Sequence, residues 1–111
     1  MTRGTTPTII LNLIGADLTS SKVYVTFLQN TGINRVLLSK SNADISMTYD
    51  IDTETTTIEV YLTQAETLAF TDPEYVQLQV RWVTSLEEAY ASPIKTVETR
   101  KILKEGVISY A

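Results

Sequence analysis

One segment in the second half of the chain alternates between apolar and polar side chains with the period of a β-strand. Residues 74–83 read EYVQLQVRWV, in which every second residue from Val76 to Trp82 is apolar. Successive side chains of a strand point to opposite faces of a sheet, so the segment predicts a strand with one buried and one exposed face. We therefore expect Trp82 in the middle of the core.

Short runs rich in threonine and branched aliphatic residues predict six further strands. They cover residues 8–14, 22–29, 34–39, 43–49, 56–62 and 89–103. The last run contains Pro93, which cannot donate a hydrogen bond to a strand ladder, so we expect it at a sheet edge with a bulge or bend. Short strands separated by turn residues predict an all-β fold, and seven of them fit an antiparallel immunoglobulin-like β-sandwich. The 111 residues are predicted to form a single domain, with residues 1–7 as an extended N-terminal arm.

The connection between the fifth and sixth predicted strands has the sequence of a short helix. Thr63 and Glu66 have the spacing of a capping box, in which each side chain accepts a hydrogen bond from the backbone of the other residue. Asp72 and Pro73 are predicted to end the segment. We expect one or two helical turns that close one end of the core, with Leu68 and Phe70 inward, in preference to a binding helix.

The chain contains neither cysteine nor histidine. Disulfides, thiolate nucleophiles and histidine-based catalytic triads are therefore excluded, and the commonest metal ligand is missing. The net charge is −4 and the basic residues are scattered, which disfavours nucleic-acid binding. The apolar runs are too short to span a bilayer, and the N-terminus lacks the apolar core of a signal peptide, so we expect an intact protein made in the cytosol.

Two sets of acidic residues are weighed as sites. The first could form a calcium loop and comprises Asp44, Asp50, Asp52 and Glu54. It lacks the glycine and glutamate spacing of an EF-hand, so solvated turns are the preferred interpretation. Glu87 and Glu88 could serve glycoside cleavage, but adjacent glutamates on a turn point apart and a filled sandwich has little cleft. The four glycines are isolated, which leaves no phosphate-binding loop. We predict a protein that is not an enzyme and has no cofactor or metal site.

The candidate contact residues are large side chains on the polar phase of the predicted strands. They are Tyr24, Tyr61, Tyr75, Ile10 and Leu28. Exposed tyrosine brings a large area with a polar tip to a contact surface, although it is equally common on ordinary sheet faces. Either a neighbouring subunit or a carbohydrate could stack on these residues. The N-terminal arm is a further candidate, because an extended polar segment could pack on a neighbour.

Five segments occur in a distinctive order along the chain. They are RGTTPT at residues 3–8, VYLTQAETLAF at 60–70, VQLQVRW at 76–82, ASPI at 91–94 and ILKEGVI at 102–108. The ordered set resembles a family of short proteins encoded by tailed bacteriophages and prophages of Gram-positive, largely gut, bacteria. The resemblance implies a small structural component of the virion, associated with the capsid, tail or baseplate, and it carries over no catalytic residue.

From this resemblance we expect a non-enzymatic virion protein that contacts other phage structural proteins and forms a homo-oligomer by sheet-edge pairing or face stacking. The alternative is a carbohydrate-binding module for host attachment. A cell-wall glycosidase that uses Glu87 and Glu88 is a third, less favoured hypothesis. We expect neither nucleic acid nor membrane among the partners.

Overall fold

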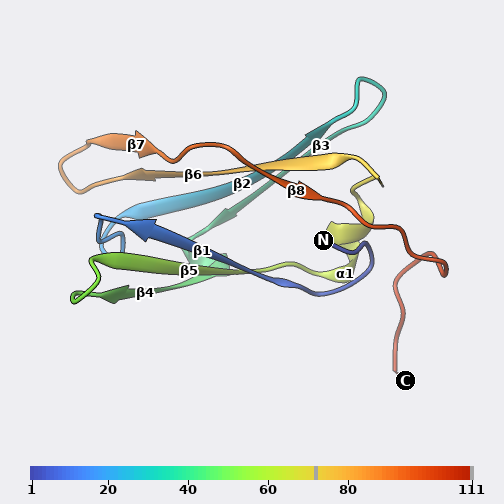
Figure 1. Cartoon of the computed structure of the whole chain (residues 1–111), viewed down its shortest axis with the longest axis horizontal. Coiled ribbons are helices and arrows are strands. Elements are labelled where there is room, and N and C mark those ends of the chain that lie inside the picture. The colour runs from blue at the N-terminus through green and yellow to red at the C-terminus, as the bar shows by residue number, and fades with distance from the viewer. Residues whose placement is uncertain (72, 111) are drawn as a thin grey trace.

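The computed structural model describes residues 1–71 and 73–110, which form two antiparallel β-sheets stacked face to face (Figure 1). The smaller sheet has three strands in the order β1-β5-β4. Its strands are β1 (Thr8–Ile14), β5 (Thr55–Tyr61) and β4 (Ile45–Asp50). Both pairings are antiparallel. Alternate side chains of each strand point toward the second sheet, in agreement with the period of two in the sequence.

The larger sheet has five strands, with β2 and β6 at its centre. Its strands are β3 (Arg35–Ser41), β2 (Lys22–Asn30), β6 (Tyr75–Val83), β7 (Ala89–Ala91) and β8 (Lys95–Glu98). The order is β3-β2-β6-β7, and β8 also pairs with β6, along the other part of its length. The two most regular sequence patterns therefore form the centre of this sheet.

The strand order makes the chain an immunoglobulin-like β-sandwich, as the sequence predicts. In that fold one sheet carries strands A, B, E and D, and the other carries G, F and C with a C′ strand in variable-type domains. Here β1, β5 and β4 occupy the B, E and D positions, while β3, β2 and β6 occupy C′, C and F. β7 and β8 together take the G position. Among residues 1–71 and 73–110, no strand occupies the A position beside β1.

The seventh predicted strand is interrupted at Pro93, as expected, and it ends earlier than predicted. Between β7 and β8, the Ser92 hydroxyl accepts the Val80 amide proton at 3.0 Å, and the Ser92 amide donates to the Val80 carbonyl at 2.8 Å. A side chain thus replaces a main-chain acceptor at the bend. The strand ends at Glu98 and not at residue 103, because Arg100 next forms a parallel bridge with Thr2.

The fourth strand begins later than predicted because a short 3-10 turn, η1 (Asn42–Asp44), precedes it. The Asn42 side chain fixes this turn to the start of β2: its oxygen accepts the Val23 amide proton at 2.7 Å, and its amide donates to the Ser21 carbonyl at 3.0 Å. The remaining strand boundaries differ from the prediction by one or two residues, which is ordinary for strand ends.

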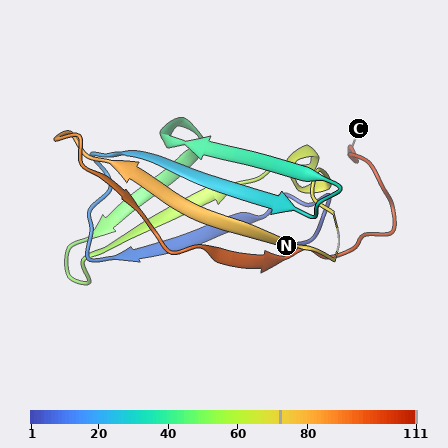
Figure 2. The ribbon, with the colours of Figure 1, turned by 90° about the horizontal axis from the view of Figure 1, so that it is seen from above.

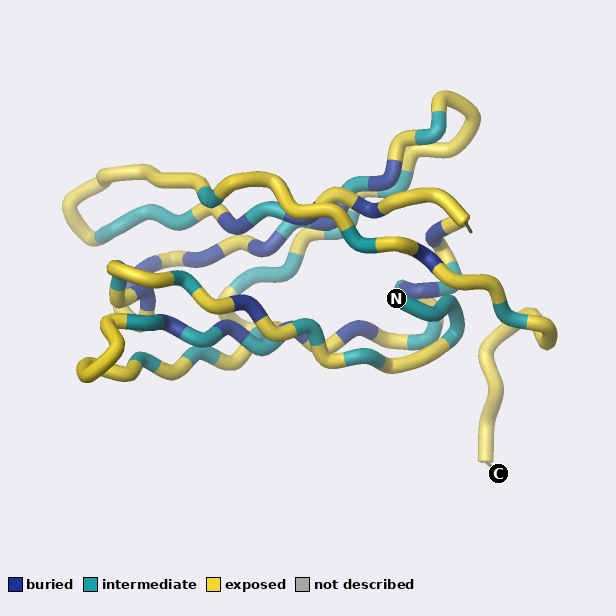
Figure 3. Tube along the Cα trace, in the orientation of Figure 1, coloured by how far each residue is buried: buried dark blue, intermediate teal, exposed yellow. Residues whose placement is uncertain are grey.

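The core lies between the sheets, where buried segments of both layers face each other (Figure 3). Its fully buried strand residues include Val23, Val25, Phe27, Ile58, Val60 and Val76. The expectation for Trp82 is wrong, since this side chain is only half-buried and lies at one end of the core. There it stacks on Tyr90 of β7, with the ring centroids 5.7 Å apart. The indole therefore covers an end of the sandwich instead of filling its middle.

The predicted helix is confirmed as α1 (Gln64–Leu68), which lies at one end of the sandwich. The Thr63 hydroxyl accepts the Glu66 amide proton at 3.2 Å, and the Glu66 carboxylate accepts the Thr63 amide proton at 2.8 Å. Phe70 is buried, as predicted, whereas Leu68 is only half-buried. The buried residue of the helix is Thr67, whose hydroxyl donates to the Thr5 carbonyl at 2.9 Å. Asp72 lies outside the described residues.

The N-terminal arm packs on its own chain. The Arg3 guanidinium donates to the carbonyls of Phe70 at 2.7 Å and Leu68 at 3.0 Å, and it pairs with Glu105 at 2.8 Å. The Met1 ammonium donates to the Glu98 carbonyl at 2.6 Å. Residues 1–7 thus join α1 to the segment after β8, and packing of this arm on a neighbouring molecule stays a prediction.

Candidate functional site

The five candidate contact residues divide between the two outer faces of the sandwich. Tyr24 and Leu28 lie on β2 and Tyr75 on β6, all on the outer face of the five-stranded sheet. Ile10 on β1 and Tyr61 on β5 lie on the opposite face of the molecule, on the three-stranded sheet. Four of them are exposed and Leu28 is half-buried. The sequence pattern identified outward positions, but it could not assign them to one sheet or the other.

The outer face of the five-stranded sheet carries an apolar row that crosses its strands. Leu37 of β3 lies opposite Leu28 of β2, which in turn lies opposite Gln77 of β6. Ile94, in the connection between β7 and β8, is the third apolar side chain of the row, and it borders a small hollow of about 120 Å³ together with Leu28, Leu37 and the polar Gln77. More than half of the Leu37 and Ile94 side chains is exposed, at 57% each. Such an apolar row on a polar sheet favours contact with another macromolecule.

Sequence reasoning missed Leu37 and Ile94 for identifiable reasons. Leu37 stands in the run Val36, Leu37 and Leu38, in which three consecutive apolar residues hide the alternation. Ile94 follows Pro93, where the strand phase slips. The pairing of Leu38 with buried Phe27 assigns Leu38 to the core, and by alternation it places Leu37 outside.

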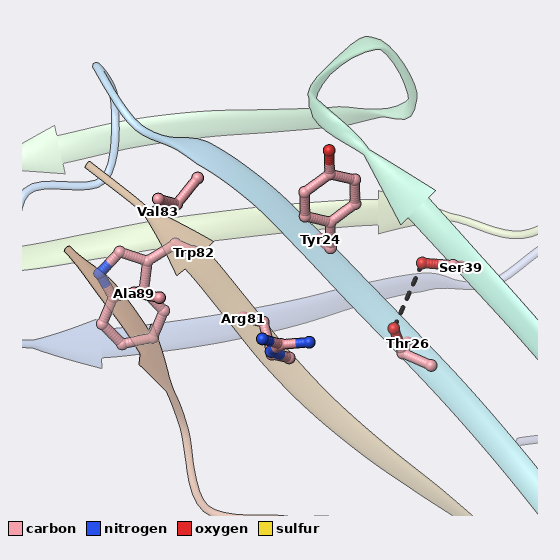
Figure 4. A pocket seen from close by; sticks show the side chains of 7 residues that line it. All are labelled: Tyr24, Thr26, Ser39, Arg81, Trp82, Val83 and Ala89. Atoms are coloured by element: carbon pink, nitrogen blue, oxygen red, sulfur yellow. Dashed lines mark hydrogen bonds between the residues drawn. The ribbon is translucent and has the colours of Figure 1, made fainter. Parts of the chain in front are cut away.

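A larger hollow, of about 380 Å³, opens on the same face near the other end of β2 (Figure 4). Its lining residues are Tyr24, Thr26, Ser39, Arg81, Trp82, Val83 and Ala89. Tyr24 and Arg81 lie opposite each other on β2 and β6, and the hydroxyls of Thr26 and Ser39 are 3.2 Å apart across β2 and β3. An aromatic ring, a guanidinium and two hydroxyls thus face one open hollow, which is a set of groups suited to a polar ligand.

The outer face of the three-stranded sheet carries mostly side chains with hydroxyl groups. Its polar residues include Thr8, Asn12, Ser46, Thr48 and Thr57. The Tyr61 hydroxyl donates to the Glu59 carboxylate at 2.9 Å, and this hydrogen bond to a neighbouring negative charge raises the pKa of Tyr61 above its ordinary value. The polar tip of Tyr61 is therefore already engaged within the sheet, whereas its ring remains exposed.

The first acidic set does not form one group. Asp44 lies in η1, before β4, whereas Asp50, Asp52 and Glu54 follow at the far end of that strand. The Asp50 carboxylate accepts the Asp52 amide proton at 2.9 Å, which is a local turn contact. Among the described residues, no cluster of three or more acidic side chains is arranged to hold a metal ion. Asp44 caps η1 and Asp50 stabilises the turn after β4.

Glu87 and Glu88 lie in the turn between β6 and β7 and are both exposed. Glu87 has a positive φ of 61°, a conformation of tight turns. The Glu88 carboxylate accepts a hydrogen bond from the Tyr90 hydroxyl at 2.7 Å, which raises the pKa of Tyr90. This arrangement orients a tyrosine beside Trp82.

None of the described helices is long and apolar enough to cross a membrane.

Comparison with known proteins does not show a family for this chain. No family model and no curated protein matches the chain. Among solved structures, the chain is similar to a structure of murine CRIg, with 15% sequence identity and a TM-score of 0.39 over 90% of this chain and 87% of that chain. The strand order within the chain itself identifies it as an immunoglobulin-like β-sandwich.

Proposed function

We propose that this chain is a non-enzymatic structural or adaptor protein of a phage virion and that it acts through protein–protein contacts. The supporting observation is the outer face of the five-stranded sheet, where Leu28, Leu37 and Ile94 form an apolar row beside exposed Tyr24 and Tyr75. Side chains of this kind are enriched where proteins meet. The resemblance of five ordered sequence segments to small phage proteins supports the virion as the place of this contact.

The charges around the apolar row indicate the chemistry of the partner. Lys22 and Arg81 share the outward phase of β2 and β6, and Arg35 is exposed at the start of β3. Two acidic residues lie on the same face: Glu98 of β8, opposite Tyr75, and Glu74, which borders a hollow with Leu28 and Tyr75. Basic residues thus outnumber acidic ones on this face, although the net charge of the chain is −4. We infer a phage structural protein that presents an apolar surface with an acidic rim.

Mass spectrometry of purified virions tests this proposal. The protein is expected in the particle at a copy number typical of a structural component, and its absence from particles would refute the virion role. A phage carrying Leu37→Glu should incorporate much less of the protein, because the substitution puts a charge into the apolar row. Ser46→Glu adds the same charge on the opposite sheet, where incorporation should stay at the parental level.

Incorporation that falls equally with both variants, while both remain folded by circular dichroism, would contradict the assignment of the contact to the five-stranded sheet. Incorporation unchanged by Leu37→Glu would contradict it as well, since Leu37 is 57% exposed and forms the β3 end of the row.

A carbohydrate-binding module for host attachment is the second candidate, and the larger hollow favours it. Tyr24 offers a ring for stacking, and Arg81, Thr26 and Ser39 offer hydrogen-bonding groups around the same space. On an array of cell-wall and capsular glycans, this function predicts a signal that Tyr24→Ala abolishes and Tyr75→Ala leaves intact. An array without signal would remove the candidate.

A further inference from the structure

We propose that two copies of this chain associate by antiparallel pairing of their β1 strands, edge to edge. The inference rests on the proposed function, because it names the surface through which a virion protein of this kind would self-associate. Its starting point is the position of β1, which lies at the edge of the three-stranded sheet and pairs only with β5 among the described strands (Figure 2). In the immunoglobulin-like order, this is the edge where strand A would lie.

The register of β1 with β5 identifies the backbone groups at the free edge. The Leu62 amide donates to the Pro7 carbonyl at 3.1 Å, and the Gly15 amide donates to the Glu54 carbonyl at 2.7 Å. Both bonds join directly opposed residues of an antiparallel ladder, in which bonded and non-bonded pairs alternate. The odd-numbered residues of β1 therefore bond to β5. The even-numbered residues point their N–H and C=O groups away from the sheet, and they are Thr8, Ile10, Asn12 and Ile14.

β1 lacks the features that protect the other sheet edges. Charged side chains, proline, bulges and short length keep exposed edges from pairing. The sequence of β1, TIILNLI, has seven residues without charge, proline or glycine. The edge strand β3 carries Arg35 and Lys40, and the edge strand β4 ends in Asp50. The opposite edge of the larger sheet is built from the short β7 and β8, with Pro93 between them.

The absence of charge from β1 favours a second copy as the partner. In pairing about a two-fold axis, the same strand faces itself, so a charged residue near the axis would lie close to its own copy and repel it. The pairing centred on Leu11 places Thr8 opposite Ile14 and Ile10 opposite Asn12. Each even-numbered residue of one strand, whose N–H and C=O groups point away from its own sheet, then lies opposite an even-numbered residue of the other strand. The backbone groups of the two residues can therefore bond in pairs.

The same register buries apolar surface on both faces of the joined sheet. On the outer face, Ile10 and Ile14 are 59% and 83% exposed in the single chain. In the pair, Ile10 of one copy lies diagonally across from Ile14 of the second copy, within contact distance of large side chains. On the inner face, β1 borders a hollow of about 130 Å³ between the sheets, lined by Leu11, Leu13 and Pro93 among others. Leu11 and Ile9 of the second copy come to lie beside this hollow.

Analytical ultracentrifugation of three versions of the full chain tests the pairing. The parental protein should sediment as a dimer at micromolar concentration. Ile10→Lys should sediment as a monomer, because it brings two like charges to the paired edge. Thr48→Lys, an exposed change on the outer face of the same sheet, should remain dimeric. A monomeric parental protein, or a dimer that Ile10→Lys leaves intact, would overturn the inference. Circular dichroism checks that both variants keep the fold.

Cysteine pairing tests the register, since the chain has no cysteine of its own. Directly opposed, hydrogen-bonded residues have Cα atoms about 5.5 Å apart, within the range of a disulfide. A mixture of Ile10→Cys and Asn12→Cys chains should yield the mixed disulfide, and either variant alone should yield little. A mixture that gives only like-with-like disulfides would refute this register.

These outcomes are separable from the proposed function. A monomer that is present in purified virions would refute the β1 pairing and leave the virion role intact. A β1-linked dimer that is absent from virions would refute the virion role and leave the pairing intact.

Discussion

Lys40 of β3 and Glu66 of α1 form an ion pair with 2.6 Å between Nζ and Oε2, which joins the five-stranded sheet to the helix at the end of the sandwich. Both side chains are largely buried, at 13% and 21% exposure. The same carboxylate accepts the amide proton of Thr63. Glu66 therefore stabilises the start of the helix and its position on the sheet at once.

Glu66→Gln separates these two roles. Glutamine also suits the third position of a capping box, so the helix start should persist while the ion pair is lost. We expect the free energy of unfolding to fall by about 1 kcal/mol, the upper end of the range for exposed ion pairs. Urea unfolding measures this loss. Lys40→Met and the double variant Lys40→Met/Glu66→Gln complete a double-mutant cycle, which gives the coupling free energy between the two side chains. A coupling free energy of zero would contradict the ion-pair role.

The same pair gives stability a defined pH dependence. Burial alone would raise the pKa of Glu66, but the hydrogen bonds from Lys40 and the Thr63 backbone, with the charge of Lys40, lower it below the ordinary value of 4.5. A group with a lowered pKa stabilises the fold above its unfolded pKa, and this stabilisation disappears as the pH falls through the folded pKa. The stability difference between parent and Glu66→Gln should therefore be constant well above pH 4.5, the ordinary pKa of this group, and shrink as the pH falls below it through the lowered pKa of folded Glu66. A difference that grows on acidification would contradict this assignment.

Gln29 is buried at 1% exposure and serves as a polar link inside the fold. Its amide donates to the Thr71 carbonyl at 2.8 Å, and its oxygen accepts the Thr71 amide proton at 2.6 Å. Gln29→Leu would leave both backbone groups without this partner, so we expect a loss of about 1–3 kcal/mol in urea unfolding. Gln77→Leu, on the exposed face of β6, should change stability by less than about 0.5 kcal/mol. Equal losses in the two variants would refute the role assigned to Gln29.

Gly4 and Gly32 allow backbone strain to be separated from crowding. Both have positive φ, at 71° and 85°, so alanine is strained at either position. A Cβ at Gly4 would lie 2.9 Å from Ile102 and 3.4 Å from Leu68, whereas nothing lies within 4 Å at Gly32. We expect Gly32→Ala to cost about 1 kcal/mol and Gly4→Ala to cost more, as measured by thermal unfolding. A Gly32→Ala variant that is the less stable of the two would contradict the contact between the arm and residue 102.

Trp82, the single tryptophan, reports on Tyr90 because their rings stack. The hydrogen bond to Glu88 raises the pKa of Tyr90 above 10.0. Ionised tyrosine accepts excitation energy from tryptophan, so Trp82 fluorescence should fall as Tyr90 ionises. In Glu88→Gln the fall should move to lower pH, and in Glu87→Gln it should stay in place. An unchanged titration in Glu88→Gln would refute the contact.

The sequence predicted the strands and the helix because both rest on local patterns. Alternation in residues 74–83 and the Thr63–Glu66 spacing are sufficient for β6 and α1. Alternation does not report depth along a strand, which is why Trp82 at the end of β6 was misplaced at the centre of the core. It also fails in runs such as residues 36–38, where the exposed Leu37 is hidden between two inward residues.

The candidate surface was less predictable because it depends on which strands become neighbours. Tyr24 and Tyr61 have the same outward phase, yet the pairing of β2 with β6 and of β5 with β1 sends them to opposite faces. The role of Arg3 was hidden for a similar reason, since its acceptors are the carbonyls of Leu68 and Phe70, distant in sequence. Only the assembled fold brings these groups together.

The bridge between Thr2 and Arg100 has a mechanical consequence. The two segments run parallel, and their bonds, from Arg100 to the Met1 carbonyl at 2.7 Å and from Arg3 to the Arg100 carbonyl at 3.2 Å, lie between the start of the chain and the segment after β8. Tension applied between Met1 and residues 101–110 would pull the parallel segments in opposite directions along their length. These bonds, and the Arg3 guanidinium beside them, would then be loaded together in shear before either sheet is drawn apart.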